Sequence, residues 1–515
     1  MICKRRGTDD SDATSASGDP QLEDIECNIL GPDLSPCDPC KELADLKILM
    51  ARLIKRRSEL KRNINRIHSP FLLKIPAEII AKISEFMITD ATIGLPSVLL
   101  LLTSICSDWR QIIVGTPQFW SSIRIDLPFD MVHSKTIRMV TFIDGWLTRS
   151  GELPLHISLG VSSGPRGSRI AAANPPEIYH PIFKTLNRYS SRWHSLNISI
   201  PPALFSYLQP DCLPLLEQLH VKMEFQEDYT GMHEYPGLLT FPPSPHLKAV
   251  GIAKTSINFG VRLMSLFSFG IQWDTVTHVS TEWLTIRESL KLLLLTPRLV
   301  HGKLHNIVGS TRDNPFLESP IVSPLIYLSL SCSQGSPSRF FDNLILPSLD
   351  TLLLSDISPT DSLIACLERS ACSLHTISLE YLWIGDFDNL IRLLQLLSPS
   401  LKKLELVVIS GDDLNDSNLQ YLSILSKTYS SQIRSAMGDY FLPHLQTFKF
   451  GVSTLSNSTT FSPNLVTWNH HPRLVTSIPL RSVHINLDTI PNPIPQDILS
   501  LLEHLKEDGI VVTLE

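Results

Sequence analysis

A six-residue pattern of apolar residues, L-x-x-[LVIF]-x-[LVIF], recurs along this 515-residue chain and constrains its fold more than any other feature. Its last three positions are apolar, variable and apolar, and alternate residues of a β-strand point to the same face. Each copy therefore predicts a strand with one buried face. The full pattern starts at Leu216, Leu247, Leu325, Leu349, Leu374, Leu401, Leu445 and Leu480, and weaker copies start at Trp193, Val276 and Leu299.

The spacing of the copies and the positions of the prolines support this interpretation. Successive copies start 23 to 44 residues apart, and most intervals lie in or near the 20–29 residues of leucine-rich repeats. Five of the 37 prolines stand two residues before the first leucine of a full copy, where chance would give about one. Proline there ends a helix and starts an extended segment without occupying a position inside the strand. These five are Pro214, Pro245, Pro347, Pro399 and Pro443.

Helical patterns lie between the strands, for example over 286–295, 362–369 and 389–397. Alternating strands and helices imply right-handed crossovers and a parallel sheet. The asparagine or cysteine that follows the last leucine of a regular repeat is missing, which predicts irregular loops around 226–240, 309–320, 410–440 and 451–477. We therefore predict an α/β fold class (α+β for the whole chain), with an irregular leucine-rich-repeat-like solenoid and one curved parallel sheet over 126–515.

The N-terminal region divides into a tail and a helix. Residues 1–40 are rich in Ser, Asp, Gly and Thr without apolar periodicity, which predicts a disordered tail. Residues 41–67 carry a heptad stripe that predicts an amphipathic helix. This stripe packs either on the protein's own body or in a coiled-coil dimer, and its basic flank indicates a solvated face. The stripe consists of Leu43, Leu46, Met50, Leu53, Arg57, Leu60, Ile64 and Ile67.

Composition excludes several classes of function. The net charge of −7 argues against nucleic acid as a partner, because phosphate binding requires a surplus of basic residues. The longest aliphatic run, Val98 to Leu102, is far shorter than the roughly 20 residues that span a bilayer, so we expect no membrane association. Without a secretory signal pattern and with only nine cysteines, we expect a cytoplasmic or nuclear protein. The single pair Cys37 and Cys40 is half of a zinc site, and two free thiols are the simpler interpretation.

Three sequence blocks occur between residues 68 and 125. The first, Ile75-Pro76-Ala77-Glu78-Ile79-Ile80, opens a predicted helix whose apolar face continues to Ile83 and Phe86. A second predicted helix contains Ile105-Cys106-Ser107-Asp108-Trp109-Arg110, and the third block is Thr116-Pro117-Gln118-Phe119-Trp120.

In this order the three blocks closely resemble the F-box of the large mushroom-type (basidiomycete) fungal family. The later segment Gly145-Trp146-Leu147-Thr148-Arg149-Ser150-Gly151-Glu152-Leu153-Pro154-Leu155 is similar to the "WLxRSGxxPL" segment that follows the box in that family. The resemblance covers about residues 41–160 and differs mainly at Ile75, where leucine is usual. It implies an F-box over 68–125 with a core of three helices.

The resemblance implies a non-enzymatic function. A member of this family docks on a Skp-type adaptor of a cullin–RING ubiquitin ligase and presents a protein substrate, which the sequence does not identify. Carried over to this chain, the adaptor-binding residues are Pro76, Ile79, Ile80 and Ile83. Trp109 and Arg110 would hold the box together or tie it to the solenoid.

The sequence contains no common catalytic motif and implies no cofactor and no metal. Phosphate-binding loops, HExxH, GxSxG and EF-hand patterns are absent. His470-His471 and the acidic residues Asp412, Asp413 and Asp416 are best interpreted as solvated loops. We expect Trp109, Trp120 and Trp146 to belong to the core. Two alternatives stay open: a scaffold protein that uses the heptad helix and the solenoid without a ubiquitin-ligase role, and an enzyme of an unrecognised type.

Overall fold

The computed structural model describes residues 38–68, 75–89, 95–128, 131–162, 176–223, 241–254, 270–309, 319–382, 387–410, 421, 424, 428, 441–454, 480–486 and 496–514. The chain divides into two compact units, Met1–Thr89 and Asp90–Glu515. This boundary falls inside the segment 68–125, so the first of the three F-box-like blocks belongs to the first unit and the other two belong to the second.

The first unit contains the helices α1 (Asp38–His68) and α3 (Ala77–Thr89). Helix α1 confirms the heptad helix and begins three residues before residue 41, inside the predicted tail. The rest of that tail, with Cys37, lies outside the described residues. Helix α3 begins directly after Pro76, whose carbonyl oxygen accepts hydrogen bonds from the backbone N–H groups of Ile79 and Ile80 (3.0 and 3.2 Å). Pro76 therefore opens the helix at the predicted place.

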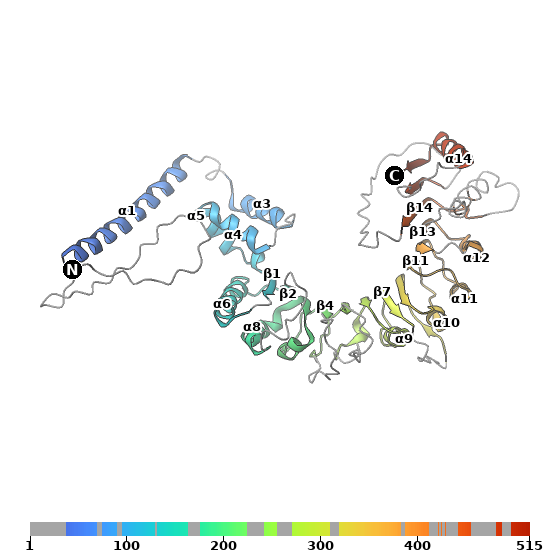
Figure 1. Cartoon of the computed structure of the whole chain (residues 1–515), viewed down its shortest axis with the longest axis horizontal. Helices are drawn as coiled ribbons and strands as arrows, with labels where there is room; N and C mark the ends of the chain where they lie inside the picture. Colours follow the sequence, from blue (N-terminus) through green and yellow to red (C-terminus); the bar gives the residue numbers. More distant parts are fainter. Residues whose placement is uncertain are drawn as a thin grey trace. The chain divides into compact units, whose positions relative to one another are not determined.

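The described part of the second unit is built on a sheet of fourteen parallel strands that follow one another in chain order (Figure 1). Two further strands, β8 and β10, form a separate parallel pair. The sheet strands are β1 (Ser122–Pro128), β2 (Leu155–Ser162), β3 (Trp193–Ile200), β4 (Gln218–Met223), β5 (Ala249–Lys254), β6 (His278–Glu282), β7 (His301–Val308), β9 (Tyr327–Gln334), β11 (Thr351–Ser355), β12 (Thr376–Leu382), β13 (Lys403–Ser410), β14 (Thr447–Thr454), β15 (Ser482–Asn486) and β16 (Val511–Leu514). The pair consists of β8 (Ile321–Val322) and β10 (Leu344–Ile345).

Helices connect these strands, and α6 and α8 to α12 lie on one side of the sheet (Figure 1). The helices of this unit are α4 (Leu95–Ile105), α5 (Ser107–Gly115), α6 (His133–Arg149), α8 (His180–Asn187), α9 (Ile286–Leu295), α10 (Ser338–Asp342), α11 (Asp361–Ser370), α12 (Phe387–Leu397) and α14 (Gln496–Glu507). Short 3₁₀ helices are η1 (Pro117–Trp120), η2 (Pro176–Tyr179), η3 (Ser190–Arg192), η4 (Pro202–Tyr207) and η6 (Trp273–Thr275). The parallel sheet with interspersed helices confirms the α/β class.

The repeated apolar pattern forms the core of this unit, as predicted. All three apolar residues of each of the eight full copies are at most 2% exposed. In the sheet they lie opposite one another: Leu219 pairs with Val250, and Leu328 pairs with Leu352. The three weaker copies also form strands, namely β3, β6 and β7. The predicted helix over 286–295 is α9.

The prolines before the strands have a more specific role than ending a helix. At four of the five positions the proline is the second residue of a β-turn, closed by a hydrogen bond from the pattern's first leucine to the residue before the proline. In the first of these turns the N–H of Leu216 donates to the carbonyl oxygen of Leu213 (3.4 Å). The fixed φ of proline suits this turn position, so the turn directs the chain into each strand. The other three turns are Ser244–Leu247, Leu346–Leu349 and Leu442–Leu445.

The start of the sheet differs slightly from the predicted boundary at residue 126. Strand β1 begins at Ser122 and pairs with β2 along its whole length. The tryptophans predicted for the core are buried there. Trp120 donates from Nε1 to the carbonyl oxygen of Ile113 (2.9 Å), Trp146 donates to that of Ser122 (3.1 Å), and the two rings meet edge to face at 4.7 Å.

Several predicted features lie mostly or entirely outside the described residues. These are the loops around 226–240, 309–320, 410–440 and 451–477, the acidic residues Asp412, Asp413 and Asp416, and the pair His470-His471. Residues 451–454, predicted as the start of a loop, belong instead to β14.

Candidate functional site

Helix α3 carries the residues that the sequence assigns to adaptor binding. Pro76 at its start, Ile79 (49% exposed) and Ile83 (36% exposed) are open to solvent. Phe86, 70% exposed, continues the same spacing of three and four residues, which places it on the same helical face. Together Pro76, Ile79, Ile83 and Phe86 are called the α3 strip below.

Ile80 does not belong to this exposed strip. It is only 3% exposed, and Ser84, one turn further along α3, is fully buried and donates from Oγ to the Ile80 carbonyl oxygen (2.8 Å). Ile80 therefore lies on the covered side of α3. The sequence had grouped it with Ile79 and Ile83 because periodicity alone does not say where a broad apolar face becomes buried.

The second and third F-box-like blocks form α4, α5 and η1. The carbonyl oxygen of Thr103 on α4 accepts a hydrogen bond from Nε of Arg110 on α5 (2.8 Å), and Trp109 is buried. Arg110 thus ties α5 to α4, which is one of the two roles expected for it. Helix α4 also exposes Leu100 and Leu101.

The heptad stripe of α1 is exposed to solvent. Leu53, Ile64 and Ile67 are 60%, 53% and 73% exposed. In the structure, therefore, the protein's own body does not cover these residues, which was one of the two predicted arrangements. Arg57 sits in the middle of the stripe as predicted.

The sheet has one face that carries the buried apolar rows and one face on which most of the intervening residues are exposed or half-buried, with small residues such as Ser329, Ser331 and Ser378 as buried exceptions. The alternation is complete in β4, where Gln218, His220 and Lys222 alternate with buried residues. We call the surface formed by these intervening residues the open face. It is mainly polar, and nearly every strand of the sheet contributes a side chain to it.

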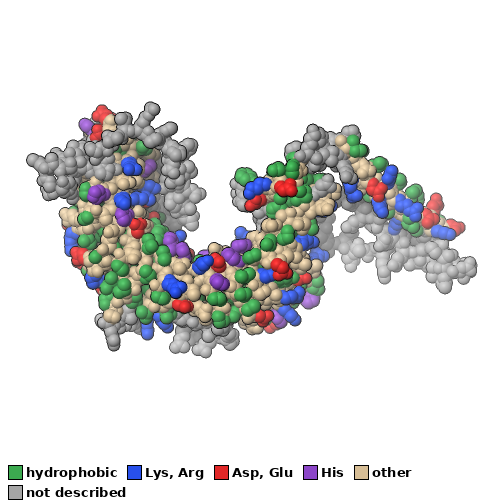
Figure 2. All heavy atoms as spheres, turned by 180° about the vertical axis from the view of Figure 1, so that it is seen from behind, with side chains coloured by type: hydrophobic (Ala, Val, Ile, Leu, Met, Phe, Trp, Pro, Cys, Tyr) green, Lys and Arg blue, Asp and Glu red, His purple; other side chains and the backbone are tan. Residues whose placement is uncertain are grey.

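Histidines are concentrated on the open face of β2 to β7, where Figure 2 shows several of them in purple. The ring of His301 stacks on that of Tyr327 at 3.9 Å and faces that of His278 at 5.5 Å. Burial lowers the pKa of His220, and burial followed by the neighbouring His278 and Lys303 lowers the pKa of His301. Burial also lowers the pKa of His156 and His305. These four imidazoles are therefore neutral at neutral pH, so they offer hydrogen bonds rather than charge.

A recurrent backbone feature ends this face. Trp283, Asn306, Asp356 and Tyr381 all have positive φ (63°, 55°, 58° and 62°), and each directly follows the third open-face residue of its strand. At Asn306 in β7 and Tyr381 in β12 the left-handed residue coincides with a shift of the strand pairing, as in a β-bulge. Such a conformation is unfavourable for residues with a Cβ atom, and its repetition marks the carboxyl ends of these strands as a place where side chains are specifically directed.

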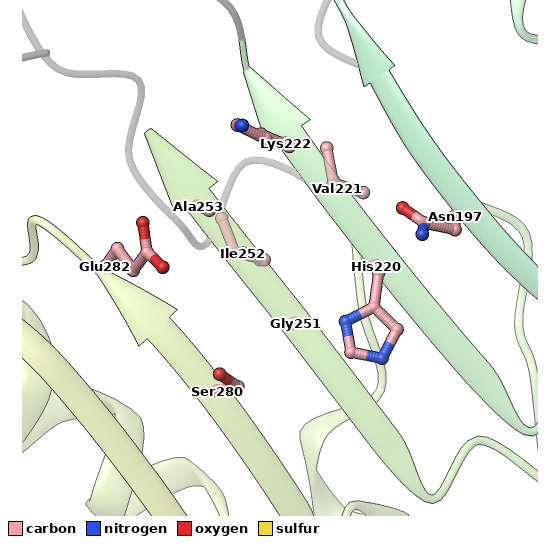
Figure 3. Close-up of a pocket in the computed structure, with 9 residues that line it drawn as sticks. All are labelled: Asn197, His220, Val221, Lys222, Gly251, Ile252, Ala253, Ser280 and Glu282. Carbon is pink, nitrogen blue, oxygen red and sulfur yellow. The ribbon is translucent and has the colours of Figure 1, made fainter. Parts of the chain in front are cut away.

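The open face contains a pocket of about 190 Å³ over strands β3 to β6 (Figure 3). Its floor is Gly251 and Ala253 on β5, and its walls are His220 and Lys222 on β4 and Ser280 and Glu282 on β6. The imidazole of His220 lies directly over Gly251. A Cβ atom added at residue 251 would stand only 2.0 Å from His220 Nδ1, so the ring can take this position only over a glycine. The sequence analysis missed this pocket, since its residues come together only through the register of three strands.

The described part of the chain contains neither a metal-binding cluster nor a helix suited to a membrane. There, no three His, Cys, Asp or Glu side chains are grouped closely enough to hold a metal ion. None of the described helices combines the length and the apolar character needed to cross a membrane. Among known proteins, no protein-family model and no characterised sequence matches this chain.

Proposed function

We propose that the protein is an F-box-type substrate receptor. In this proposal the α3 region binds a Skp-type adaptor and, through it, a cullin–RING ubiquitin ligase in the cytoplasm or nucleus. The second unit is a leucine-rich-repeat-like curved solenoid whose open face holds a protein substrate. The chain contributes proximity rather than chemistry, because holding a substrate lysine near the ubiquitin-carrying enzyme raises their effective concentration.

The observation that carries the proposal is the exposed α3 strip. It follows a motif that resembles the start of the F-box, and it leaves Ile79 and Phe86 49% and 70% exposed. Aliphatic and aromatic side chains grouped on one exposed helical face are typical of a protein-binding surface.

The open face supports the second half of the proposal. A long sheet with a polar surface of histidine, lysine, serine and glutamate side chains offers many hydrogen-bonding groups to a protein ligand. The extended surface of a repeat array is suited to such contacts.

Co-purification of the adaptor tests the first half. We expect full-length protein to retain a Skp-type adaptor, and Ile79→Asp combined with Ile83→Asp to abolish retention, because two carboxylates would lie in the apolar interface. Ile137→Asp on α6 is the matched control, since Ile137 is a helical isoleucine with a similar exposure of 56%. Absence of the adaptor from the wild-type eluate, or its retention by the double variant, would contradict the proposal.

A non-catalytic scaffold without a ubiquitin-ligase role is the second candidate, and exposure of the α1 stripe favours it. Six apolar heptad residues of α1 are between 46% and 73% exposed, so α1 offers a second interaction surface. Analytical ultracentrifugation of the full chain and of a variant with Leu53→Glu and Leu60→Glu separates the candidates. A scaffold that assembles through α1 loses its oligomeric state in the variant and retains no adaptor.

A further inference from the structure

Strand β5 differs from the other described strands of the sheet in what it presents on the open face. Its three open-face residues are Ala249, Gly251 and Ala253, none of which extends beyond Cβ. The neighbouring positions on β4 are Gln218, His220 and Lys222, and those on β6 are His278, Ser280 and Glu282. The small side chains of β5 leave room between the longer polar side chains of β4 and β6, and the His220 ring fills part of that room over Gly251, which leaves the depression over Ala253 (Figure 3).

The walls carry opposite charges that do not neutralise each other. Lys222 on β4 pairs in register with Ala253 on β5, so a strand that carries only a methyl group there separates Lys222 from Glu282 on β6. Strands β4 and β6 are two strand spacings apart, roughly 9.6 Å. Both side chains are exposed, and neither is ion-paired within the described part of the chain. Burial lowers the pKa of His305 beside Glu282, while the Glu282 carboxylate acts in the opposite direction.

This arrangement discriminates between ligand charges. A singly charged group in the depression is attracted by one wall and repelled by the other, so the two Coulomb contributions largely cancel. A neutral amide satisfies both walls, because its oxygen accepts from an ammonium group while its N–H donates to a carboxylate. Asn197, the imidazole of His220 and the hydroxyl of Ser280 line the same pocket and add neutral donors and acceptors.

The size of the pocket limits what can enter. At about 190 Å³ it is smaller than the roughly 300–1,000 Å³ of pockets that enclose cofactors or drug-sized molecules. A single amino-acid side chain or one peptide unit is an occupant of this size.

We propose that the pocket binds one amide group of a protein substrate, with the amide oxygen at Lys222 and the amide N–H at Glu282. The amide comes from an Asn or Gln side chain or from an exposed main-chain peptide unit. The inference rests on the part of the proposed function in which the open face holds a protein, and it does not depend on adaptor binding.

Selection of random linear dodecapeptides displayed on yeast against the full-length protein tests this proposal. We expect enriched peptides to share Asn or Gln at one position if a side chain binds. If main chain binds, we expect no shared side chain, and methylation of one peptide nitrogen in a synthetic copy should abolish binding. Enrichment of Asp/Glu-only or Lys/Arg-only motifs, or of no peptide at all, overturns the proposal.

Charge-reversal variants then locate the binding by fluorescence anisotropy of the enriched peptides. Lys222→Glu and Glu282→Lys should each weaken binding at least tenfold, because each creates two walls of like charge. The double variant K222E/E282K should recover to within threefold, because an amide can rotate to exchange its donor and acceptor ends. Lys303→Glu, a matched reversal on β7 outside the pocket, should stay within threefold. Single variants that bind like wild type, or a double variant that binds no better than the singles, contradict the proposal.

The two proposals fail separately. Lys222→Glu should retain the adaptor in co-purification even when it no longer binds the peptides. A wild-type protein that binds pocket-dependent peptides but no adaptor refutes the receptor proposal alone, whereas one that binds adaptor but no such peptide refutes only the amide pocket.

Discussion

Helix α3 and the open face of the sheet both alternate covered and exposed residues, but they expose opposite kinds of side chain. The exposed side of α3 carries Ile79, Ile83 and Phe86, whereas the open face around β4 carries Gln218, His220 and Lys222. Fully burying one isoleucine or phenylalanine side chain contributes about 1.5–3 kcal/mol, so α3 gains most from a partner that covers it. The open face loses little by staying solvated, which suits contacts that depend on directional hydrogen bonds.

The largest expected effect distinguishes the two sides of α3. Ile80→Asp should destabilise α3 by about 3 kcal/mol or more, because it removes a buried apolar side chain and places a carboxylate there. Ile79→Asp should change the stability of α3 by less than about 0.5 kcal/mol, since Ile79 is half exposed. Hydrogen–deuterium exchange of the peptide covering residues 77–89 measures both. Equal protection in the two variants would mean that α3 has no covered side.

A second pair of variants compares the two faces of the sheet on adjacent residues of β11. Leu352→Ala should lower the free energy of unfolding by about 2–5 kcal/mol, because Leu352 is 1% exposed between the sheet and its helices. Leu353→Ala on the open face should cost less than about 1 kcal/mol. Urea unfolding followed by circular dichroism gives both values, and similar losses would contradict the assignment of the faces.

A third test concerns the left-handed residues at the carboxyl ends of the strands. Asp356→Gly should stabilise the protein by about 0.5–1 kcal/mol relative to Asp356→Ala, because both remove the carboxylate and only glycine relieves the clash of Cβ at φ 58°. Thermal unfolding of the two variants provides the comparison. If the alanine variant is as stable as the glycine variant, the positive φ carries no strain.

The smallest effect is the pH dependence contributed by His220. Burial lowers its pKa in the folded protein below the value in the unfolded chain, so between these two values the unfolded state binds more protons. Its stabilising contribution is therefore present above the unfolded pKa, about 6.5, and is lost as the pH falls towards the folded pKa. Melting temperatures between pH 7.5 and 5.0 should fall less steeply for His220→Gln than for wild type. An unchanged slope would show that the His220 imidazole is as well solvated as in the unfolded chain.

The sequence was sufficient to predict these strands because each one repeats a period of two in apolar residues, and four of them also follow a proline turn. All eleven predicted copies form strands, whereas β16, which has no such turn proline, was not predicted. The α3 residues were predicted as one face, but the coverage of Ile80 depends on tertiary packing that helical periodicity does not encode. The pocket could not be predicted either. Lys222, Ala253 and Glu282 become neighbours only through the pairing of β4, β5 and β6 across loops of unequal length.

The chain order of the strands also determines how the sheet tolerates duplication or deletion of its units during evolution. Because each strand of the fourteen-stranded sheet is hydrogen-bonded to the preceding and following strand of that sheet, a duplicated or deleted unit disturbs two junctions and leaves the other units in register. Each duplication would lengthen the open face by one strand spacing, about 4.8 Å, so the sheet can grow by whole units.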